Sequence, residues 1–284
     1  MKILITGAAG KLAKTFATEL TTNHDVLALS RDDMDITDFN AVKQQVLVYE
    51  PDIVLHSAAW TDVDGCARDP LRAVLINGLG TQNVAVAAAN VGAAIVYISS
   101  NEVFDGLSDQ LYYVYDATNP ANPYCYSKWV GEQAVKSLNP RHYIVRTSWV
   151  FAHGGRNFIH AILNAAHEGK QLRVVTDEIA NPTYNDDLVA AVAQLIQTER
   201  YGIYHFANGG AAPRYDFARH ALDAAGYDDV PIERITIADW PRPSTPPPNA
   251  GLANMAGAMI GITLRPWQKA VDAFLEKEGL FVVR

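Results

Sequence analysis

Short apolar runs alternate with longer segments of helical pattern along the first half of the chain. The apolar runs predict strands at Lys2–Ile5, Val26–Leu29, Ile53–His56, Ala94–Ser99 and Tyr143–Arg146. The segments between them predict helices near Lys11–Leu20, Phe39–Val48, Leu71–Asn90 and Tyr124–Leu138. Continuous Ile, Val and Leu runs without polar alternation are typical of strands buried on both faces. The pattern therefore predicts an α/β fold in which helices cover both faces of a parallel sheet.

The second half of the chain is less regular and begins with a glycine-rich segment at Ala152–Arg156. Helices are expected near Phe158–His167, Asp187–Gln197, Tyr215–Ala225 and Trp267–Glu276, and strands at Leu172–Val175 and Tyr204–Phe206. Pro266 suits the first position of the last helix, where the missing N–H costs no hydrogen bond. The proline-rich stretch Pro241–Pro248 is predicted to be an ordered wall or linker rather than a disordered segment.

Composition and charge exclude several classes of function. The 284 residues carry a net charge of −8, so the basic surface that nucleic-acid binding needs is missing. No apolar run approaches the ~18 residues of a membrane span, and no membrane association is expected. Cys66 and Cys125 are too few for a disulfide framework, which predicts reduced thiols in a cytoplasmic protein. Met1–Gly7 already has the pattern of a buried strand, so no export signal is expected, and no metal site is predicted.

A glycine loop follows the first predicted strand and opens the first predicted helix. Gly7 permits a tight turn, and Gly10 lets the backbone approach a pyrophosphate, which the helix N-terminus then stabilises. Ala13, at the third position, is small enough for close packing of helix on strand. Ordinary βα turns also contain such glycines. The position directly after the first strand nevertheless favours a dinucleotide site, which would include Lys11 and Leu12.

The end of the second predicted strand selects the cofactor. An acidic residue there binds the ribose 2′-hydroxyl of NADH, whereas a cation accommodates the 2′-phosphate of NADPH. Ser30 and Arg31 supply a hydroxyl and a guanidinium, which suit a phosphate. NADPH is therefore the predicted cofactor. NADH is left open, because Asp32, Asp33 and Asp35 follow closely and because Arg31 also fits a solvated surface charge.

Tyr124 and Lys128 lie four residues apart on a predicted helix, so both side chains point to one face. A phenol with a pKa near ~10 is a poor acid–base group at neutral pH, and a nearby ammonium is expected to lower that pKa. Ser99 and Ser100 end the fourth predicted strand, where a hydroxyl can bind a substrate oxygen beside the phenol. The spacing also fits a solvated helix surface. Together with the glycine loop, however, it favours redox chemistry on a carbonyl or hydroxyl.

These motifs resemble the extended short-chain dehydrogenase/reductase family, in which a Ser or Thr, a Tyr and a Lys form the catalytic triad. The resemblance narrows to the dTDP-4-dehydrorhamnose reductase branch on segments that occur in the right order over nearly the whole chain: His56-Ser57-Ala58-Ala59-Trp60-Thr61-Asp62-Val63-Asp64, Val103–Gly106, Arg146–Phe151, Asn157-Phe158, Asn181–Thr183 and Gly202–His205. It implies a Rossmann-like doubly wound parallel sheet with a smaller C-terminal substrate-binding domain. We expect the dinucleotide-binding domain at residues 1–150 and a mainly substrate-binding domain at 151–284, with residues from about 184 to 208 returning to the first.

The resemblance also implies roles for individual residues. Ser100 would orient the substrate carbonyl, Tyr124 would protonate its oxygen, and Lys128 would lower the phenol pKa and bind the nicotinamide ribose. With the residues already named, the implied cofactor site comprises Gly7, Gly10, Lys11, Leu12, Ser30, Arg31, Asp35, Ile36, Ala58, Ala59, Asn77, Tyr124 and Lys128. The implied sugar site comprises Val63, Asn101, Glu102, Trp149 and Asn157. A plain core aromatic is the alternative for Trp149.

The implied activity is the NAD(P)H-dependent reduction of the 4-keto group of a nucleotide-linked 6-deoxy sugar, as in dTDP-L-rhamnose biosynthesis. A homodimer is left open. One alternative is a nucleotide-sugar epimerase or a reductase of another keto sugar. Another is a non-catalytic dinucleotide-binding protein similar to the regulatory subunit of methionine adenosyltransferase, although the intact set of Ser100, Tyr124 and Lys128 argues against it.

The chain departs from the family pattern at two places. Related 4,6-dehydratases carry Thr-Asp-Glu where this chain has Ser100-Asn101-Glu102, and Asn101 cannot ionise. Glu102 stands where many of the reductases carry Tyr, so it either contacts the sugar or retains base chemistry such as epimerisation. Near the C-terminus, Pro246 and Ala250 replace an arginine and a serine of the reductase pattern. The remaining candidates for binding a diphosphate are the arginines at 156, 214 and 242, each of which also fits a surface charge.

Overall fold

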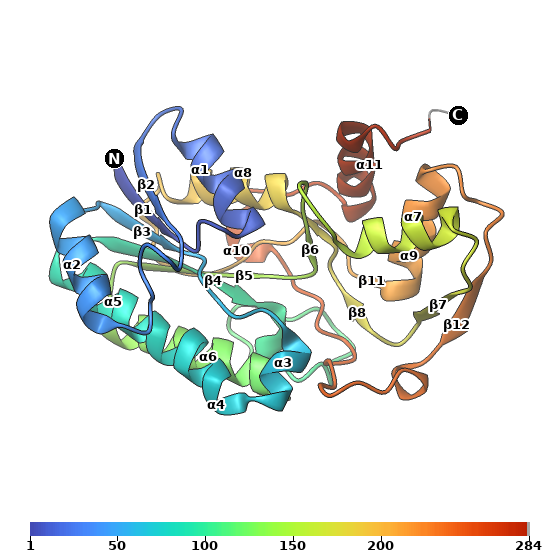
Figure 1. Ribbon diagram of the computed structural model, residues 1–284, viewed down its shortest axis with the longest axis horizontal. Coiled ribbons are helices and arrows are strands. Elements are labelled where there is room, and N and C mark those ends of the chain that lie inside the picture. The colour runs from blue at the N-terminus through green and yellow to red at the C-terminus, as the bar shows by residue number, and fades with distance from the viewer. Residues whose placement is uncertain (283–284) are drawn as a thin grey trace.

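Six parallel strands form the central layer of the computed structural model, which describes residues 1–282 (Figure 1). They are β1 (Lys2–Thr6), β2 (Asp25–Leu29), β3 (Ile53–His56), β4 (Ala94–Ser100), β5 (His142–Thr147) and β10 (Gly202–His205), in the order β10-β5-β4-β3-β1-β2. These strands lie within two residues of their predicted bounds. In the register of β1, Ile3 stands opposite Val26 of β2 on one side and Ile53 of β3 on the other. The strand order therefore reverses at β1, where sheets of this kind bind their ligands.

Helices cover both faces of the sheet, which confirms the doubly wound prediction (Figure 1). On one face, α1 (Lys11–Leu20) and α8 (Asn185–Leu195) pack against alternate residues of β1, Ile3 and Ile5. On the other face, α2 (Phe39–Tyr49), α5 (Thr81–Asn90) and α6 (Pro123–Leu138) form a core with Leu4 of the same strand. This two-residue alternation is what a strand with two apolar faces requires.

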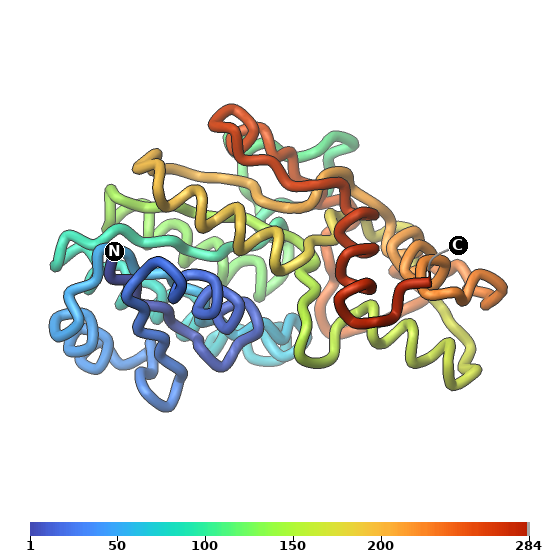
Figure 2. The backbone as a smooth tube through the Cα atoms, turned by 90° about the horizontal axis from the view of Figure 1, so that it is seen from above, coloured from blue at the N-terminus to red at the C-terminus, as the bar shows by residue number. Residues whose placement is uncertain are grey.

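A second lobe lies beside the carboxyl end of the sheet and has its own apolar core (Figure 1). The lobe contains α7 (Phe158–His167), α9 (Arg214–Ala224), α11 (Trp267–Glu278), β7 (Leu172–Val175) and β12 (Ile232–Ile235). Among the smaller elements, β6 (Val150–Phe151) pairs with β9 (Thr183–Tyr184), and β8 (Ile179–Ala180) pairs with β11 (Ala212–Pro213). The short helix η3 (Ile237–Asp239) follows β12, and α10 (Met255–Ala258) packs against the core of the first lobe. Figure 2 shows the N-terminus in the first lobe and the C-terminal helix in the second lobe, toward opposite ends of the molecule.

We propose to divide the chain as the sequence suggests, with residues 1–150 as the dinucleotide-binding domain and most of 151–284 as the substrate-binding domain. Segment 184–208 supports this division, because it carries α8 and β10, which pack in the first lobe. Residues 283–284 lie outside the described residues. No helix within residues 1–282 is long and apolar enough to cross a membrane.

The segment Leu71–Asn90, predicted as one helix, is helical throughout but changes its winding. After α3 (Val63–Arg68), which the sequence did not predict, come α4 (Pro70–Ala73), the π-helix η1 (Val74–Gly80) and α5. Glycines allow close packing here, since a Cβ on Gly78 would lie 2.8 Å from Val130 of α6. A short π-helix within a longer helix barely alters the spacing of apolar residues, so the sequence pattern does not indicate η1. Such π-helical segments occur frequently at functional sites.

The proline-rich stretch is an ordered wall, as predicted. The carbonyl of Pro248 accepts a hydrogen bond from the N–H of Ile179 at 2.7 Å, and that of Thr245 accepts one from the Asn122 side chain at 3.1 Å. Pro266 caps α11 one residue before its predicted position.

Candidate active site

A cavity of about 710 Å³ opens at the carboxyl ends of β1, β3, β4 and β5. Its walls come from the loops that follow these strands and from the first turns of α1 and α6. Gly7 follows β1, Ala58 follows β3, Ser100 ends β4, and Thr147 ends β5. The cavity therefore lies at the reversal of strand order, where the sequence places the dinucleotide.

The glycine loop is shaped to receive a pyrophosphate. Gly7 has φ +77°, and a Cβ there would lie 2.8 Å from Cα of Ala58, so only glycine fits. Gly10 is the N-cap of α1 and offers no side-chain cap, and the first turn of the helix holds no acidic residue. The first N–H groups of α1 are thus not engaged by a side-chain cap and suit an anion. Lys11 and Leu12 line the cavity beside them.

The segment after β2 forms the end of the cavity where the sequence analysis expects the adenosine. Arg31, Asp35 and Ile36 line the wall, together with Met34, which the sequence analysis did not identify. The guanidinium of Arg31 contacts Asp35 at 3.4 Å, and its side chain is 72% exposed. Ser30 is not among the lining residues, because its hydroxyl donates to Asp33 at 2.6 Å. Of the proposed phosphate pair, only the arginine faces the cavity.

Ser100, Tyr124 and Lys128 lie along one wall of the same cavity. Asn122 caps α6 by accepting the N–H of Cys125 at 3.0 Å, so that Tyr124 falls in the first turn of the helix. Lys128 follows one turn later and donates to the carbonyl of Ile98 at 2.7 Å. The hydroxyl of Ser100 accepts the N–H of Glu102 at 3.1 Å.

The electrostatics of this wall differ from the expectation that Lys128 lowers the pKa of the phenol. Burial raises the pKa of Tyr124, and the neighbouring carboxyl of Glu102 raises it further. Lys128 is itself buried, and burial lowers its pKa to about 7 although Glu132 acts in the opposite direction. Desolvation therefore outweighs the attraction between phenolate and ammonium. The phenol is kept protonated at neutral pH, which is the state of a proton donor.

Asn77 lies behind the cavity wall rather than in it. Its side chain accepts the N–H of Trp60 at 2.7 Å and donates to the carbonyl of Trp60 at 3.0 Å. It also donates to the hydroxyl of Ser127 at 2.9 Å, which in turn donates to the carbonyl of Tyr124 at 2.7 Å. Asn77, on the π-helix, therefore ties the loop after β3 to the turn that carries the phenol.

His56 continues this network with a fixed direction of hydrogen bonding. The hydroxyl of Thr81 gives its proton to the carbonyl of Asn77 at 2.7 Å, so it accepts from Nε2 of His56 at 3.0 Å. Nδ1 of His56 then accepts from Thr6 at 2.7 Å. Burial, followed by the charge of Lys128, lowers the pKa of His56 to about 3, so the ring is neutral. This fits a hydrogen-bonding role and not an acid–base role.

A buried ion pair below the site escaped the sequence analysis. Glu132 receives two hydrogen bonds from Arg146, at 2.9 and 2.8 Å, and one from Ser99 at 2.6 Å. Both charged side chains are at most 2% exposed. Glu132 lies one turn beyond Lys128 on the same face of α6. The continued four-residue spacing of Tyr124, Lys128 and Glu132 is therefore the sequence pattern that could have indicated it.

The predicted sugar residues divide into lining and supporting groups. Val63, Asn101, Glu102 and Trp149 line the cavity. Asn157 does not; it caps α7 by accepting the N–H of His160 at 3.0 Å. Asn101 also donates to the carbonyl of Ala250 at 3.1 Å, which joins the end of β4 to the C-terminal segment.

Trp149 has a backbone φ of +39°, which is strained for a side chain of this size. The guanidinium of Arg214 lies 3.4 Å from the centre of its ring and is held by Glu178 at 2.7 Å. None of the candidate arginines at 156, 214 and 242 lines the cavity. Arg242 pairs instead with Asp64 at 3.0 Å.

Two further lining residues point to a bound molecule. The hydroxyls of Thr147 and Ser148 are buried and have no hydrogen-bond partner among residues 1–282. Buried polar groups are normally satisfied, so these hydroxyls fit contacts with a ligand. Their place at the end of a parallel strand, within the family segment Arg146–Phe151, is the signal for them in the sequence.

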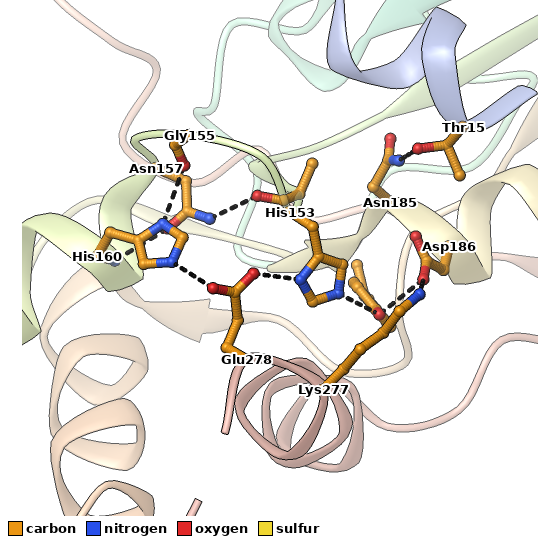
Figure 3. A network of polar contacts seen from close by, with 11 residues as sticks. Thr15, His153, Gly155, Asn157, His160, Asn185, Asp186, Lys277 and Glu278 are labelled. Atoms are coloured by element: carbon orange, nitrogen blue, oxygen red, sulfur yellow. Dashed lines mark hydrogen bonds and ion pairs between the residues drawn. The ribbon is translucent and has the colours of Figure 1, made fainter. Parts of the chain in front are cut away.

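A polar cluster holds the glycine-rich loop that borders the cavity (Figure 3). The carboxylate of Glu278, in α11, lies between the imidazoles of His153 and His160, with a distance of 3.2 Å to His160. The carbonyl of Arg156 in this loop accepts a hydrogen bond from Lys11 at 2.6 Å. Because Lys11 also lines the cavity, the C-terminal helix is linked to the mouth of the cofactor site through this loop.

Comparison with known proteins agrees with this geometry. The family model described as RmlD substrate binding domain matches residues 1–279. The chain is 36% identical to the spore coat polysaccharide biosynthesis protein SpsK of Bacillus subtilis, over 98% of each chain. It is 38% identical to a dTDP-4-dehydrorhamnose reductase of Mycolicibacterium smegmatis, over 95% of this chain and 84% of that one.

A solved structure is similar to this chain over nearly its whole length. The dTDP-4-dehydrorhamnose reductase of Bacillus anthracis, in complex with NADP, superposes with a TM-score of 0.94 at 33% identity, over 97% of this chain and 99% of that one. The match in sequence and in structure extends over both lobes and over the residues that line the cavity. The chain therefore belongs to the RmlD family, the dTDP-4-dehydrorhamnose reductase branch of the extended short-chain dehydrogenases/reductases.

Proposed function

We propose that the protein reduces the 4-keto group of dTDP-4-dehydrorhamnose with NADPH, a step of dTDP-L-rhamnose biosynthesis. One observation carries this proposal: a single cavity contains both the glycine cradle of α1 and the wall with Ser100, Tyr124 and Lys128. A dinucleotide and a carbonyl can thus meet within it. The names of the relatives supply the identity of the sugar.

The bound dinucleotide supplies the hydride that reduces the keto carbon. Tyr124 donates the proton to the carbonyl oxygen, and the raised pKa of its phenol keeps that proton available at neutral pH. Ser100 orients the carbonyl from the end of β4. Lys128, fixed on the carbonyl of Ile98, would hold the ribose of a bound dinucleotide by hydrogen bonding. Positioning of these groups by α6 and β4 supplies part of the rate enhancement.

NADPH is the proposed cofactor, with NADH as the alternative. Arg31 at the end of β2 supports NADPH, and so does the NADP complex of the relative from Bacillus anthracis. A cytoplasmic location and a homodimer remain predictions from the sequence.

The test follows the loss of NADPH absorbance after addition of freshly made dTDP-4-dehydrorhamnose, with NADH in parallel. Substrate-dependent loss is expected, and faster with NADPH. Tyr124→Phe should keep NADPH affinity and lose at least ~10²-fold in turnover, because it lacks the proton donor. If the wild-type protein binds NADPH but consumes none, an epimerase, another keto sugar or a regulatory binding role replaces the proposal.

A further inference from the structure

The reduction described above leaves one ionisable side chain of the cavity unused. Glu102 lies in η2 (Asn101–Val103), directly after β4, and lines the cavity on the wall that carries Tyr124. Its backbone N–H is held by the hydroxyl of Ser100 at 3.1 Å. Its carboxyl contacts the thiol of Cys125, the residue after Tyr124, at 3.2 Å, and it raises the pKa of the phenol. A carbonyl oxygen bound by Tyr124 therefore has a carboxyl group beside it.

The groups around Glu102 leave its carboxylate without a paired cation. From α6, Cys125 donates its thiol to Oε2 at 3.2 Å, and Tyr124 and Asn122 are close neighbours. From the second lobe, Glu178 and Arg214 face it, but they bind each other at 2.7 Å. No ion pair to Glu102 occurs within residues 1–282. Burial raises the pKa of Glu102, and Glu178 adds to this effect, which makes the ionised form a stronger base.

A keto sugar bound for reduction presents acidic C–H bonds at the two carbons next to its carbonyl. Since these carbons are one bond away from the carbon that Tyr124 and Ser100 position, a base on the same wall is suitably placed to reach one of them. We propose that Glu102 is that base, so that the site enolises its nucleotide-linked keto sugar in addition to reducing it. The inference rests on the proposed function, because the same cavity must hold the same substrate.

The reaction is balanced without an oxidant or a reductant. The carboxylate of Glu102 takes the proton, and the electron pair of the C–H bond forms the carbon–carbon double bond of the enol. The carbonyl oxygen accepts the proton of Tyr124. In the reverse direction Tyr124 recovers its proton, and the carbon is reprotonated by Glu102. When Glu102 exchanges its proton with water in between, hydrogen from the solvent enters the sugar.

The experiment measures this exchange directly. The protein is incubated in D₂O with dTDP-4-dehydrorhamnose and NADP⁺, so that no hydride is available, and deuterium at the carbons beside the carbonyl is measured by mass spectrometry and NMR. Exchange is expected to exceed that of a sample without protein. Reduction with NADPH is measured on the same preparation. Reduction without enzyme-dependent exchange would overturn the inference alone, whereas absence of both would overturn the proposed function.

Glu102→Gln tests the residue. The ratio of exchange rate to reduction rate should fall at least ~10²-fold, which is the usual contribution of a general base. An unchanged ratio would overturn the role of Glu102.

Cys125→Ala provides a second test that does not depend on the first variant. The thiol hydrogen bond lowers the pKa of Glu102, so without it the rise of exchange with pH should shift to higher pH. An unshifted pH profile would show that another group removes the proton.

Discussion

We propose that the choice between the two nicotinamide cofactors depends on a single side chain, that of Arg31. Arg31 follows β2 and is the member of the Ser30–Arg31 pair that lines the cavity. Its contact with Asp35, at 3.4 Å and with the guanidinium mostly exposed, is weak. The guanidinium can therefore turn to a 2′-phosphate at little cost. A hydrogen bond between charged groups contributes about 1.5–3 kcal/mol, which is enough to set a cofactor preference.

Arg31→Ala should weaken NADPH binding by about tenfold or more and leave NADH binding nearly unchanged, because only NADPH carries the phosphate. Dissociation constants for both cofactors, from fluorescence titration, provide the measurement. Arg173→Ala, which removes an arginine paired with Glu233 in the second lobe, is the matched control. Equal losses for NADPH and NADH would contradict recognition of the phosphate by Arg31.

At the scale of elements, the turn from β1 into α1 depends on glycine for two separate reasons. Gly7 needs a positive φ, and it also needs space, because Ala58 in the loop after β3 lies against it. A side chain at this position would strain the backbone by about 1–2 kcal/mol and would push apart the two loops that form the cofactor cradle. Gly169, which follows α7, shares the first requirement with φ +65° but has no atom within 4 Å of its missing Cβ.

Comparison of Gly7→Ala with Gly169→Ala separates strain from contact. Both should lower the melting temperature, because both place alanine at a positive φ. Only Gly7→Ala should lose NADPH affinity, by about tenfold for each 1.4 kcal/mol of misfit in the cradle. Retained affinity in Gly7→Ala would show that the loop after β3 yields to the added methyl group.

The elements of the sheet were predictable because buried parallel strands and amphipathic helices leave strong local patterns. The glycine turn after β1 and the four-residue spacing of Tyr124 and Lys128 could be located because they too are local patterns in the sequence. The π-helix could not, since one wide turn hardly changes the apolar period. Nor could the pKa of Tyr124, because it depends on the burial of the phenol and on Glu102, twenty-two residues away. Asn157 was assigned to the sugar from its motif, whereas the structure uses it to cap α7.

At the scale of the whole molecule, α11 closes the second lobe onto the loop beside the cofactor site (Figure 3). Burial raises the pKa of Glu278, but hydrogen bonds from His153 and His160 outweigh it and lower the pKa overall. A carboxyl with a lowered pKa contributes stability above its ordinary pKa, and the contribution is lost as the pH falls through the lowered value. The contribution of Glu278 to the link between lobe and loop is therefore lost in acid.

Glu278→Gln should reduce the free energy of unfolding by about 1–3 kcal/mol at neutral pH, since it removes charged hydrogen bonds. The difference from wild type should shrink in acid, below the ordinary range of a glutamate pKa. Urea denaturation at a series of pH values measures both effects. Glu276→Gln, an exposed position on the same helix, should change stability by no more than about 0.5 kcal/mol. Equal effects of the two variants would refute the role of the cluster.

The return of α8 and β10 to the first lobe has a consequence for synthesis on the ribosome. During synthesis β1 to β5 emerge from the ribosome first, and the segment from β6 to β9 follows. Only afterwards do α8 and β10, which complete the sheet and its cover, emerge. Until residue 205 has emerged, the edge of β5 lacks its neighbour, and Ile3, Ile5 and Val96 lack the cover of α8. Uncovered edges and apolar faces favour aggregation. A fragment cut at residue 150 would therefore aggregate rather than yield the cofactor domain alone, whereas a chain that joins 1–150 to 184–208 restores both missing elements.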